Sequence, residues 1–246
     1  MTDIASPQNP RIKALRRLHT KRERARSGRF LAEGEDLVAA AAQAGRAAVE
    51  GYRLAGSGLG EAGFHDVEKA TLAGVSSLGS GTRVIGVYEQ RWGTPRGPLC
   101  VYLHGVADPG NVGTVLRAAQ AFGASSVALG PGCADPHSPK AVRAGMGAIF
   151  AVEIARAGGP AELPGRRIAL VPEAPATLLA EAAGAGAAGG VTLVVGAERD
   201  GLPAGVAEAC DAQARIPIAS HSLNAAMAAT VALYEMTREP SRVPAS

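Results

Sequence analysis

From residue 99 onward, the sequence alternates between short runs that are apolar throughout and segments with a helical pattern. A strand that is apolar at every position is buried on both faces, and helices between such strands cover a parallel sheet. The alternation therefore predicts an α/β fold with a parallel sheet. The expected strands are residues 99–106, 125–130, 149–154, 166–172, 191–198 and 214–218, and the expected helices are 111–123, 138–147, 177–186 and 222–238.

The first ninety residues predict a smaller α/β domain. RWGTPRGP, residues 91–98, contains two prolines and two glycines and indicates a boundary, which gives domains 1–94 and 95–246. The elements expected before it are a helix over 9–27, a strand over 29–34, a helix from 35 closed by Gly45, and strands over 49–56 and 83–90.

Positive charge is concentrated at the N-terminus. Residues 1–30 contain nine Lys and Arg residues against two acidic ones, whereas the whole chain has a formal net charge of +3. A basic block at the end of a mildly acidic chain is typical of a protein that contacts a polyanion such as RNA. The alternative is that the block forms the solvated face of a helix.

The sequence argues against several classes of protein. No apolar run reaches the roughly 18 residues that a membrane helix needs, and the N-terminus has no apolar signal region, so we expect a cytoplasmic protein. Cys100, Cys133 and Cys210 are far apart, which suits a reducing compartment and predicts no metal site. The sequence also lacks the phosphate-binding loop, the dinucleotide fingerprint, the nucleophile elbow and the zinc-protease helix.

Three strand-to-helix junctions are the candidate sites, because ligands of parallel sheets bind beyond the carboxyl ends of the strands. At the first, a turn over 108–111 precedes a helix that carries Arg117 among apolar residues. A turn with a cap explains residues 108–111 without any function. Arg117 is either a functional residue or a surface residue of an amphipathic helix.

The second junction is VVGAERDGLP, residues 194–203, where glycine would let a ligand approach the backbone closely. The third is IPIASHSLN, residues 216–224, which precedes an alanine-rich helix. Ser222 is predicted to cap that helix through its hydroxyl group, and the alternative is that the polar side chains and free amides there also hold a ligand.

Taken in this order, the three junctions resemble the motifs of the SpoU/TrmH family of RNA ribose 2′-O-methyltransferases, of the SPOUT class, over residues 97–236. The N-terminal half is similar to the L30e/L7Ae-type RNA-binding domain that precedes the catalytic domain in many members, chiefly through RFLAEGEDLV, residues 29–38. The matching motifs are Asn111-x5-Arg117-x5-Gly123, then Gly196-x-Glu198-x-x-Gly201-Leu202, then Ile216-Pro217 followed by Ser222-Leu223-Asn224.

The resemblance implies a deep trefoil knot, a homodimer, S-adenosylmethionine as methyl donor and rRNA rather than tRNA as substrate. It implies catalytic roles for Asn111, Arg117, Glu198, Ser222 and Asn224, and donor binding by Gly196, Gly201, Leu202, Ile216 and Leu223. The residues expected to contact RNA are Arg11, Lys13, Arg16, Arg17, Arg29, Lys140 and Arg143.

A ribose 2′-hydroxyl is a poor nucleophile and must lose its proton as it attacks. Because an arginine is normally too basic to be neutral, we expect Arg117 to hold the target phosphate and to stabilise the developing alkoxide. The alternative, suggested for the family, is that Arg117 acts as general base after a phosphate docks beside it, although a phosphate favours the charged guanidinium.

The third motif departs from the family pattern. Only residues 218–221 separate Pro217 from Ser222, whereas family members usually have six residues there, including a glycine. A shortened loop leaves open a second hypothesis, a non-catalytic RNA-binding or ribosome-assembly factor that kept the fold. A third hypothesis, a small-molecule or nucleotide-binding α/β domain, explains the sheet but not the basic N-terminus.

Overall fold

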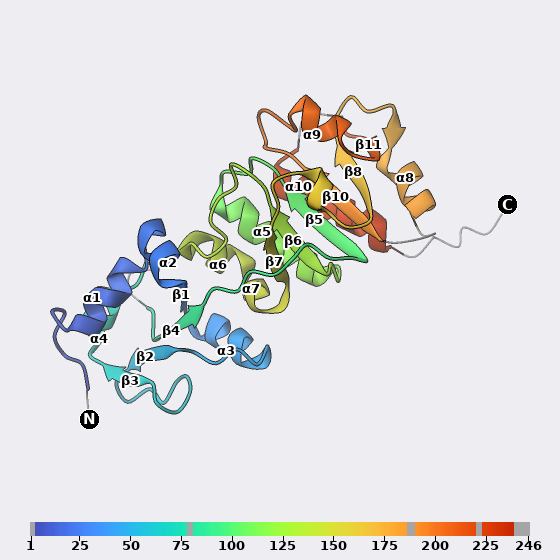
Figure 1. Ribbon diagram of the computed structural model, residues 1–246. Helices are drawn as coiled ribbons and strands as arrows, with labels where there is room; N and C mark the ends of the chain where they lie inside the picture. Colours follow the sequence, from blue (N-terminus) through green and yellow to red (C-terminus); the bar gives the residue numbers. More distant parts are fainter. Residues whose placement is uncertain (1–2, 78–80, 186–189, 220–222, 239–246) are drawn as a thin grey trace. The chain divides into compact units, whose positions relative to one another are not determined.

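The computed structural model describes residues 3–77, 81–185, 190–219 and 223–238, and Figure 1 shows its elements. The chain forms two compact units. The first contains Met1–Trp92, Asp108–Arg117 and Ala134–Ala151, and the second contains the remainder. The first segment of the first unit ends at Trp92, two residues before the domain boundary predicted after residue 94. The two later segments of the first unit lie within the predicted second domain, and the sequence pattern did not indicate this grouping.

The first unit is built on a four-stranded sheet with strand order β1-β4-β2-β3. Strand β4 is antiparallel to β1 and β2, and β2 is parallel to β3. Its core joins apolar residues of the first helix, such as Ile12 and Leu15, to Leu31 and Ile85 of the sheet. Its elements are α1 (Pro10–Arg17), α2 (Lys21–Ser27), β1 (Arg29–Glu33), α3 (Glu35–Gln43), β2 (Glu50–Leu54), β3 (His65–Val67), α4 (Lys69–Ala73), β4 (Val84–Glu89), α6 (Pro139–Gly145) and α7 (Ala148–Ala151).

The helix predicted over 9–27 is wrong as a single element, because the chain forms α1 and α2 instead. The hydroxyl of Thr20 accepts a hydrogen bond from the backbone N–H of Glu23 at 3.3 Å and so begins a new helix. Gly28, with φ of 67°, ends it in the left-handed conformation that glycine adopts without strain. The local capping interaction of Thr20 therefore prevails over the continuous helical pattern.

The strand predicted over 149–154 is also wrong in its first half, which forms α7 before β7 begins. Phe150 of α7 packs against Tyr88 and Phe30, with ring centroids 4.8 and 5.8 Å away. Tertiary packing of these rings decides the local structure, since a short apolar run fits a buried strand and a buried helix equally well.

In the described part of the chain, the second unit is built on a sheet of seven strands, which are parallel throughout, in the order β7-β6-β5-β10-β8-β11-β9. The central strands are buried on both faces, as the sequence predicted: Cys100, Tyr102 and Leu193 are fully buried. The strands are β5 (Leu99–Leu103), β6 (Ser126–Leu129), β7 (Glu153–Arg156), β8 (Arg166–Leu170), β9 (Ala176–Thr177), β10 (Val191–Val195) and β11 (Ala212–Arg215).

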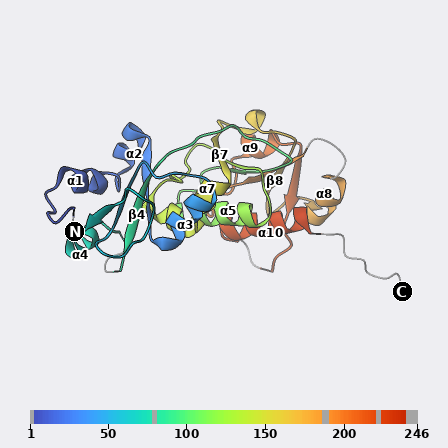
Figure 2. The ribbon, with the colours of Figure 1, turned by 90° about the horizontal axis from the view of Figure 1, so that it is seen from below.

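Helices cover the sheet of the second unit. Figure 2 shows α9 and α10 on opposite sides of it. The sequence pattern missed α9, the two-residue strand β9 and the 3-10 turn η1 (Pro160–Glu162), which are too short to show a period. The remaining helices are α5 (Pro109–Ala121), which spans both units, α8 (Leu178–Ala185), α9 (Ala204–Glu208) and α10 (Ala225–Thr237).

The predicted α/β class, with a parallel sheet and a smaller N-terminal domain, is confirmed. The trefoil knot stays a prediction, since residues 220–222 of the third motif lie outside the described residues. Within the described part of the chain, no helix is both long and apolar enough to cross a membrane.

Candidate active site

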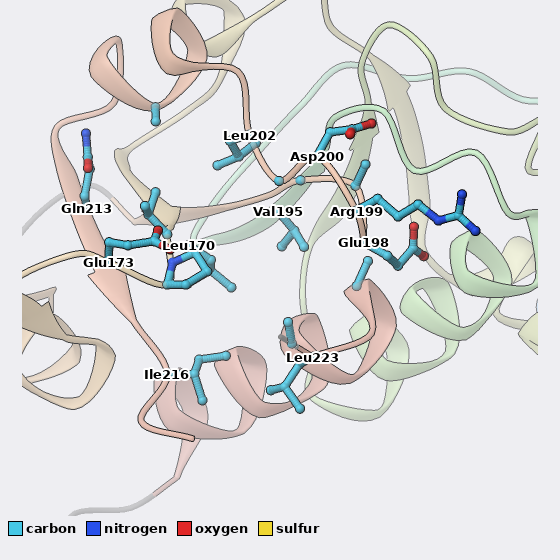
Figure 3. Close-up of a pocket in the computed structure, with 18 of the residues that line it drawn as sticks. Leu170, Glu173, Val195, Glu198, Arg199, Asp200, Leu202, Gln213, Ile216 and Leu223 are labelled. Carbon is cyan, nitrogen blue, oxygen red and sulfur yellow. The ribbon is translucent and has the colours of Figure 1, made fainter. Parts of the chain in front are cut away.

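A cavity of about 540 Å³ lies at the carboxyl ends of β8, β10 and β11, within the second unit (Figure 3). Its lining comes mainly from residues 170–173 after β8, residues 195–202 after β10, and Ile216, Ile218 and Leu223 after β11. This is the edge of a parallel sheet where ligands bind, and the volume suits a small molecule. The second and third predicted junctions meet here.

The loop after β10 is a tight turn. The backbone N–H of Ala197 donates to the carbonyl oxygen of Gly201 at 3.1 Å, and the N–H of Gly201 donates back to Ala197 at 3.0 Å. A Cβ on Gly196 would lie 2.3 Å from the backbone of Gly201. We expected Gly196 to let a ligand approach, but its nearest neighbour is the chain itself. The glycine is needed so that the turn can close, and the turn holds Glu198 at the cavity.

The helix α10 begins at the edge of the same cavity. Asn224 is its N-cap: the side-chain oxygen accepts hydrogen bonds from the backbone N–H groups of Ala226 at 2.9 Å and Met227 at 3.3 Å. The prediction that Ser222 caps this helix is therefore wrong, because the first helical turn begins two residues later. Ser222 itself lies outside the described residues.

Every residue predicted to bind the donor lines this cavity, and so does Glu198. Asn224 directly follows the lining residue Leu223. Neither Asn111 nor Arg117 is among the lining residues; both lie on α5. The donor-binding residues concerned are Gly196, Gly201, Leu202, Ile216 and Leu223.

Arg117 is exposed and makes no hydrogen bond or ion pair with any residue that the structure describes. Its helix begins earlier than predicted, at Pro109, because the carboxylate of Asp108 accepts from the backbone N–H of Asn111 at 3.0 Å. Lys140 donates to the other oxygen of Asp108 at 2.6 Å. This hydrogen bond lowers the pKa of Asp108 below its ordinary value.

The start of α5 lies directly against α6. A Cβ on Gly113 would lie 2.2 Å from the carbonyl oxygen of Ala141 and 2.8 Å from the side chain of Ala144. Gly145 faces the backbone of Gly113 in the same crossing. The glycines let the two backbones touch, and Arg117 follows Gly113 by one helical turn.

The basic residues of the N-terminal block fall into two groups. Some are held within the first unit: Arg11 pairs with Glu50 at 3.5 Å, and Arg16 donates to backbone carbonyl groups. Others are exposed and make no hydrogen bond or ion pair with described residues through their side chains, namely Lys13, Arg17, Lys21 and Arg22. Lys21 and Arg22 belong to the basic block but are not among the residues chosen from the sequence as expected RNA contacts.

The remaining predicted RNA contacts differ in their surroundings. Arg29 is half-buried on β1. Lys140 is 57% exposed but pairs with Asp108. Arg143 is exposed near the end of α6 and has no ion-pair partner in the described part of the chain.

Arg24 of the basic block is not available to RNA, because its side chain is 4% exposed and pairs with Asp135 at 2.8 Å. It also donates to the carbonyl oxygens of Leu18 and His19, both at 2.9 Å. Burial alone would raise the pKa of Asp135, but hydrogen bonds from His137 and the guanidinium of Arg24 outweigh it and hold that pKa well below its ordinary range.

The cavity wall is acidic. The described lining residues include four carboxylates, on Glu173, Glu198, Asp200 and Glu208, and one guanidinium, on Arg199. Such a wall repels anionic ligands, which disfavours nucleotide phosphates and with them the hypothesis of a nucleotide-binding domain. No group of His, Cys, Asp and Glu in the described residues is arranged to hold a metal ion.

Comparison with known families matches most of the chain. The model of the SpoU rRNA Methylase family matches residues 98–234, which is more than half of the sequence. The chain belongs to this family. Residues 9–78 match the MRM3-like substrate binding domain, which covers α1 to α4. The predicted SpoU/TrmH resemblance is thus confirmed.

Relatives agree with this assignment. The chain is 29% identical to the 23S rRNA (guanosine(2553)-2'-O)-methyltransferase RlmP of Bacillus subtilis, over 96% of this chain and 99% of RlmP. It is 40% identical to an uncharacterized tRNA/rRNA methyltransferase of Mycobacterium tuberculosis over 145 residues, and that match spans only half of the mycobacterial protein. An AdoMet-bound rRNA methyltransferase structure from Sinorhizobium meliloti has a TM-score of 0.81 at 30% identity, over 95% of this chain and 96% of that one.

Proposed function

We propose that this chain transfers a methyl group from S-adenosylmethionine to a ribose 2′-hydroxyl of 23S rRNA. The observation that carries the proposal is the cavity, since residues of the second and third motifs meet around it in a family of methyltransferases. The relatives in the comparison are methyltransferases by name, and none of them supports a non-catalytic assembly factor.

The cavity fits the methyl donor in size and in chemistry. Leu170, Leu202, Ile216 and Leu223 offer apolar surface for an adenine ring, as Figure 3 shows. The carboxylates suit a ligand that carries a positive sulfonium group. When bound, S-adenosylmethionine supplies an activated methyl group that a nucleophilic oxygen can accept.

The chain's own residues then position and stabilise the reacting ribose. Arg117 is exposed and unpaired among described residues, so its guanidinium is able to bind a phosphate of the target and to stabilise the negative charge that develops on the 2′-oxygen. Glu198 and Asn224, which lie on or beside the cavity wall, would orient the ribose, as would Asn111 and Ser222.

The N-terminal helices would hold the RNA. Lys13, Arg17, Lys21 and Arg22 are exposed cations whose side chains make no hydrogen bond or ion pair with described residues, on a segment that matches a substrate binding domain. Arg29, Lys140 and Arg143 would add contacts on the same unit. The three cysteines are free thiols, which suits the cytoplasm, where the proposed substrate is found.

We also propose a homodimer. Helix α10 exposes three large apolar side chains, Met227, Val231 and Tyr234, at the spacing of one helical face. Such a stripe on the surface is typical of a protein interface. Light scattering of the chain and of the variant Met227→Glu, Tyr234→Glu tests this: a dimer that becomes a monomer supports it, and a wild-type monomer at micromolar concentration contradicts it.

Methyl transfer is tested with the purified chain, radiolabelled S-adenosylmethionine and ribosomal RNA lacking the modification. Mass-spectrometric mapping identifies the product nucleotide. A single new 2′-O-methyl group in 23S rRNA is the expected result. Donor binding without transfer to any rRNA would contradict the proposed activity, and no donor binding would favour the assembly-factor hypothesis.

A further inference from the structure

Glu173 presents a carboxylate to the cavity that the family motifs do not include. It follows β8 and lines the cavity, and Figure 3 shows its side chain extending from the loop toward the cavity interior. The side chain makes no hydrogen bond or ion pair with any described residue. A charged group that is exposed to the cavity and has no protein partner there is available to a ligand.

The loop that carries Glu173 is held in place from both ends. The backbone N–H of Val171 donates to Ala214 of β11 at 3.0 Å, and the N–H of Ala174 donates back to Val171 at 3.1 Å. The guanidinium of Arg215 donates to the carbonyl oxygens of Ala174 at 2.7 Å and Pro175 at 2.5 Å. A loop fixed before the ligand arrives loses little entropy on binding, so its carboxylate is preorganised.

The position of Glu173 indicates which part of the donor it meets. Figure 3 shows Glu173 and Glu198 on opposite sides of the cavity. Glu198 is expected beside the reacting methyl group, and Leu170, which offers apolar surface for an adenine ring, lies next to Glu173, so we expect the nucleoside on the Glu173 side. A carboxylate at the end of a parallel strand commonly accepts hydrogen bonds from ribose hydroxyls, and two adjacent hydroxyls can bind its two oxygens together.

We propose that Glu173 binds the ribose hydroxyl groups of the methyl donor. The assignment rests on the proposed function, because it needs the donor in this cavity. This contact would let the site recognise a ribonucleoside through a side chain, in addition to the backbone contacts implied for the second and third motifs. Glu173 would act in binding only, and it has no part in the transfer step itself.

The test uses calorimetry on the full chain and on Glu173→Ala, whose change lies on an exposed side chain. The probes are S-adenosylmethionine, 5′-methylthioadenosine, which carries no charge and no amino-acid part, and the 2′,3′-dideoxy form of methylthioadenosine. We expect the substitution to lower the affinity for the first two probes by about tenfold or more, as for the loss of hydrogen bonds to a charged group. The dideoxy probe should bind both proteins equally, and Glu173→Gln, which keeps one acceptor oxygen, should lie between them.

The other outcomes overturn the assignment in distinguishable ways. Equal weakening of the dideoxy probe means that Glu173 does not act through the hydroxyls. Lower affinity for S-adenosylmethionine alone means that Glu173 pairs with the amino-acid part or with the sulfonium charge. Failure of the wild-type chain to bind S-adenosylmethionine overturns the proposed function together with this assignment, whereas tight binding that is insensitive to Glu173→Ala overturns only the latter.

Discussion

At the scale of single residues, Arg117 is exposed on α5 and has no partner among the described residues, although apolar residues flank it. We expect Arg117→Ala to lower single-turnover methyl transfer by about 10²–10³-fold, the usual loss when one group that stabilises transition-state charge is removed. Affinity for S-adenosylmethionine, measured by calorimetry, should stay the same because Arg117 does not line the cavity.

A matched control lies one turn further along the same helix. Gln120 is also exposed on α5, and Gln120→Ala should leave both measurements unchanged. Arg117→Lys should recover only part of the rate, since an ammonium group cannot bind a phosphate in the bidentate way that a guanidinium can. Turnover of Arg117→Ala near that of the wild type would show that Arg117 is a surface residue.

Asn224 has a structural role as well as the proposed catalytic one, and two substitutions separate them. Asn224→Ala removes the cap of α10 and should cost about 1 kcal/mol of unfolding free energy. Asn224→Asp keeps the accepting oxygen and should retain that stability while losing the amide donor. A folded Asn224→Asp variant with wild-type methyl transfer would leave Asn224 as a cap only; chemical denaturation and the transfer assay measure the two effects.

At the scale of elements, the crossing of α5 and α6 depends on the absence of a side chain at Gly113. A Cβ there would lie 2.2 Å from a backbone oxygen, which cannot move as a side chain can. Gly113→Ala should therefore destabilise the protein by about 1–3 kcal/mol, although alanine is the better helix former. Thermal unfolding measures this effect, and Thr114→Ala, on the exposed side of the same turn, is the control. Equal stability of the two variants would contradict a tight crossing.

The sheet of the second unit was predictable because each central strand is apolar along its whole length, and only a doubly covered sheet buries such strands. The helix α7, which the pattern predicted as strand, was decided by contacts distant in sequence. The ring packing of Phe150 turned half of a predicted strand into α7. The break between α1 and α2, by contrast, has a local signal: Thr20 with Glu23 three residues later is a capping pattern that the helical periodicity concealed.

The site was predictable to the extent that its residues belong to motifs. Gly196, Glu198 and Leu223 meet at one cavity, as the order of the junctions indicated. Glu173 could not be predicted, because a lone carboxylate after a strand has no spacing that distinguishes it from a surface residue. The sequence also could not show why position 196 must be glycine, because the close contact with Gly201 exists only once the turn has closed.

At the scale of the whole molecule, we expect the exposed cations of α1 and α2 to supply much of the proposed affinity for RNA. Replacing Lys13, Arg17, Lys21 and Arg22 with alanine should weaken binding to an rRNA fragment. It should also reduce the slope of log affinity against log salt by about 0.7–0.9 for each phosphate that the protein no longer neutralises. Fluorescence anisotropy over a range of salt concentrations measures both quantities.

The control for this prediction is Arg26, which belongs to the same block and is 69% exposed but pairs with Glu23. Arg26→Ala should change affinity and slope much less than any one of the four unpaired cations. A salt slope that is the same for the fourfold variant and the wild type would show that the block is only a solvated helix face.

We expect the interactions of Asp135 with His137 and Arg24 to make the stability of the first unit depend on pH in the acid range. Because the pKa of Asp135 is depressed in the folded protein, its contribution is present above the unfolded value near 4 and is lost as the pH falls below it. Asp135→Asn should cost about 3–5 kcal/mol at pH 7, since Arg24 then stays buried without a counter-charge. This difference from the wild type should shrink below pH 4 in denaturation experiments.

Asp211→Asn is the matched comparison, because Asp211 pairs with Arg167 but is 38% exposed. An exposed ion pair contributes at most about 1 kcal/mol, so this variant should lose far less stability than Asp135→Asn. If both variants lost the same small amount of unfolding free energy, the buried pair would stabilise the protein no more than an exposed one.

Chimeras made from two relatives are expected to fold well when the join keeps each spatial unit within one parent, rather than when it merely separates the sequence motifs. A join at residue 94 between two relatives would bring together an Arg24 from one parent and an Asp135 from the other, and likewise a Phe30 and a Phe150. Chimeras of that kind should therefore succeed only when the parents agree at these positions. The substrate-binding and catalytic halves are in this sense inherited together, although each has a family of its own.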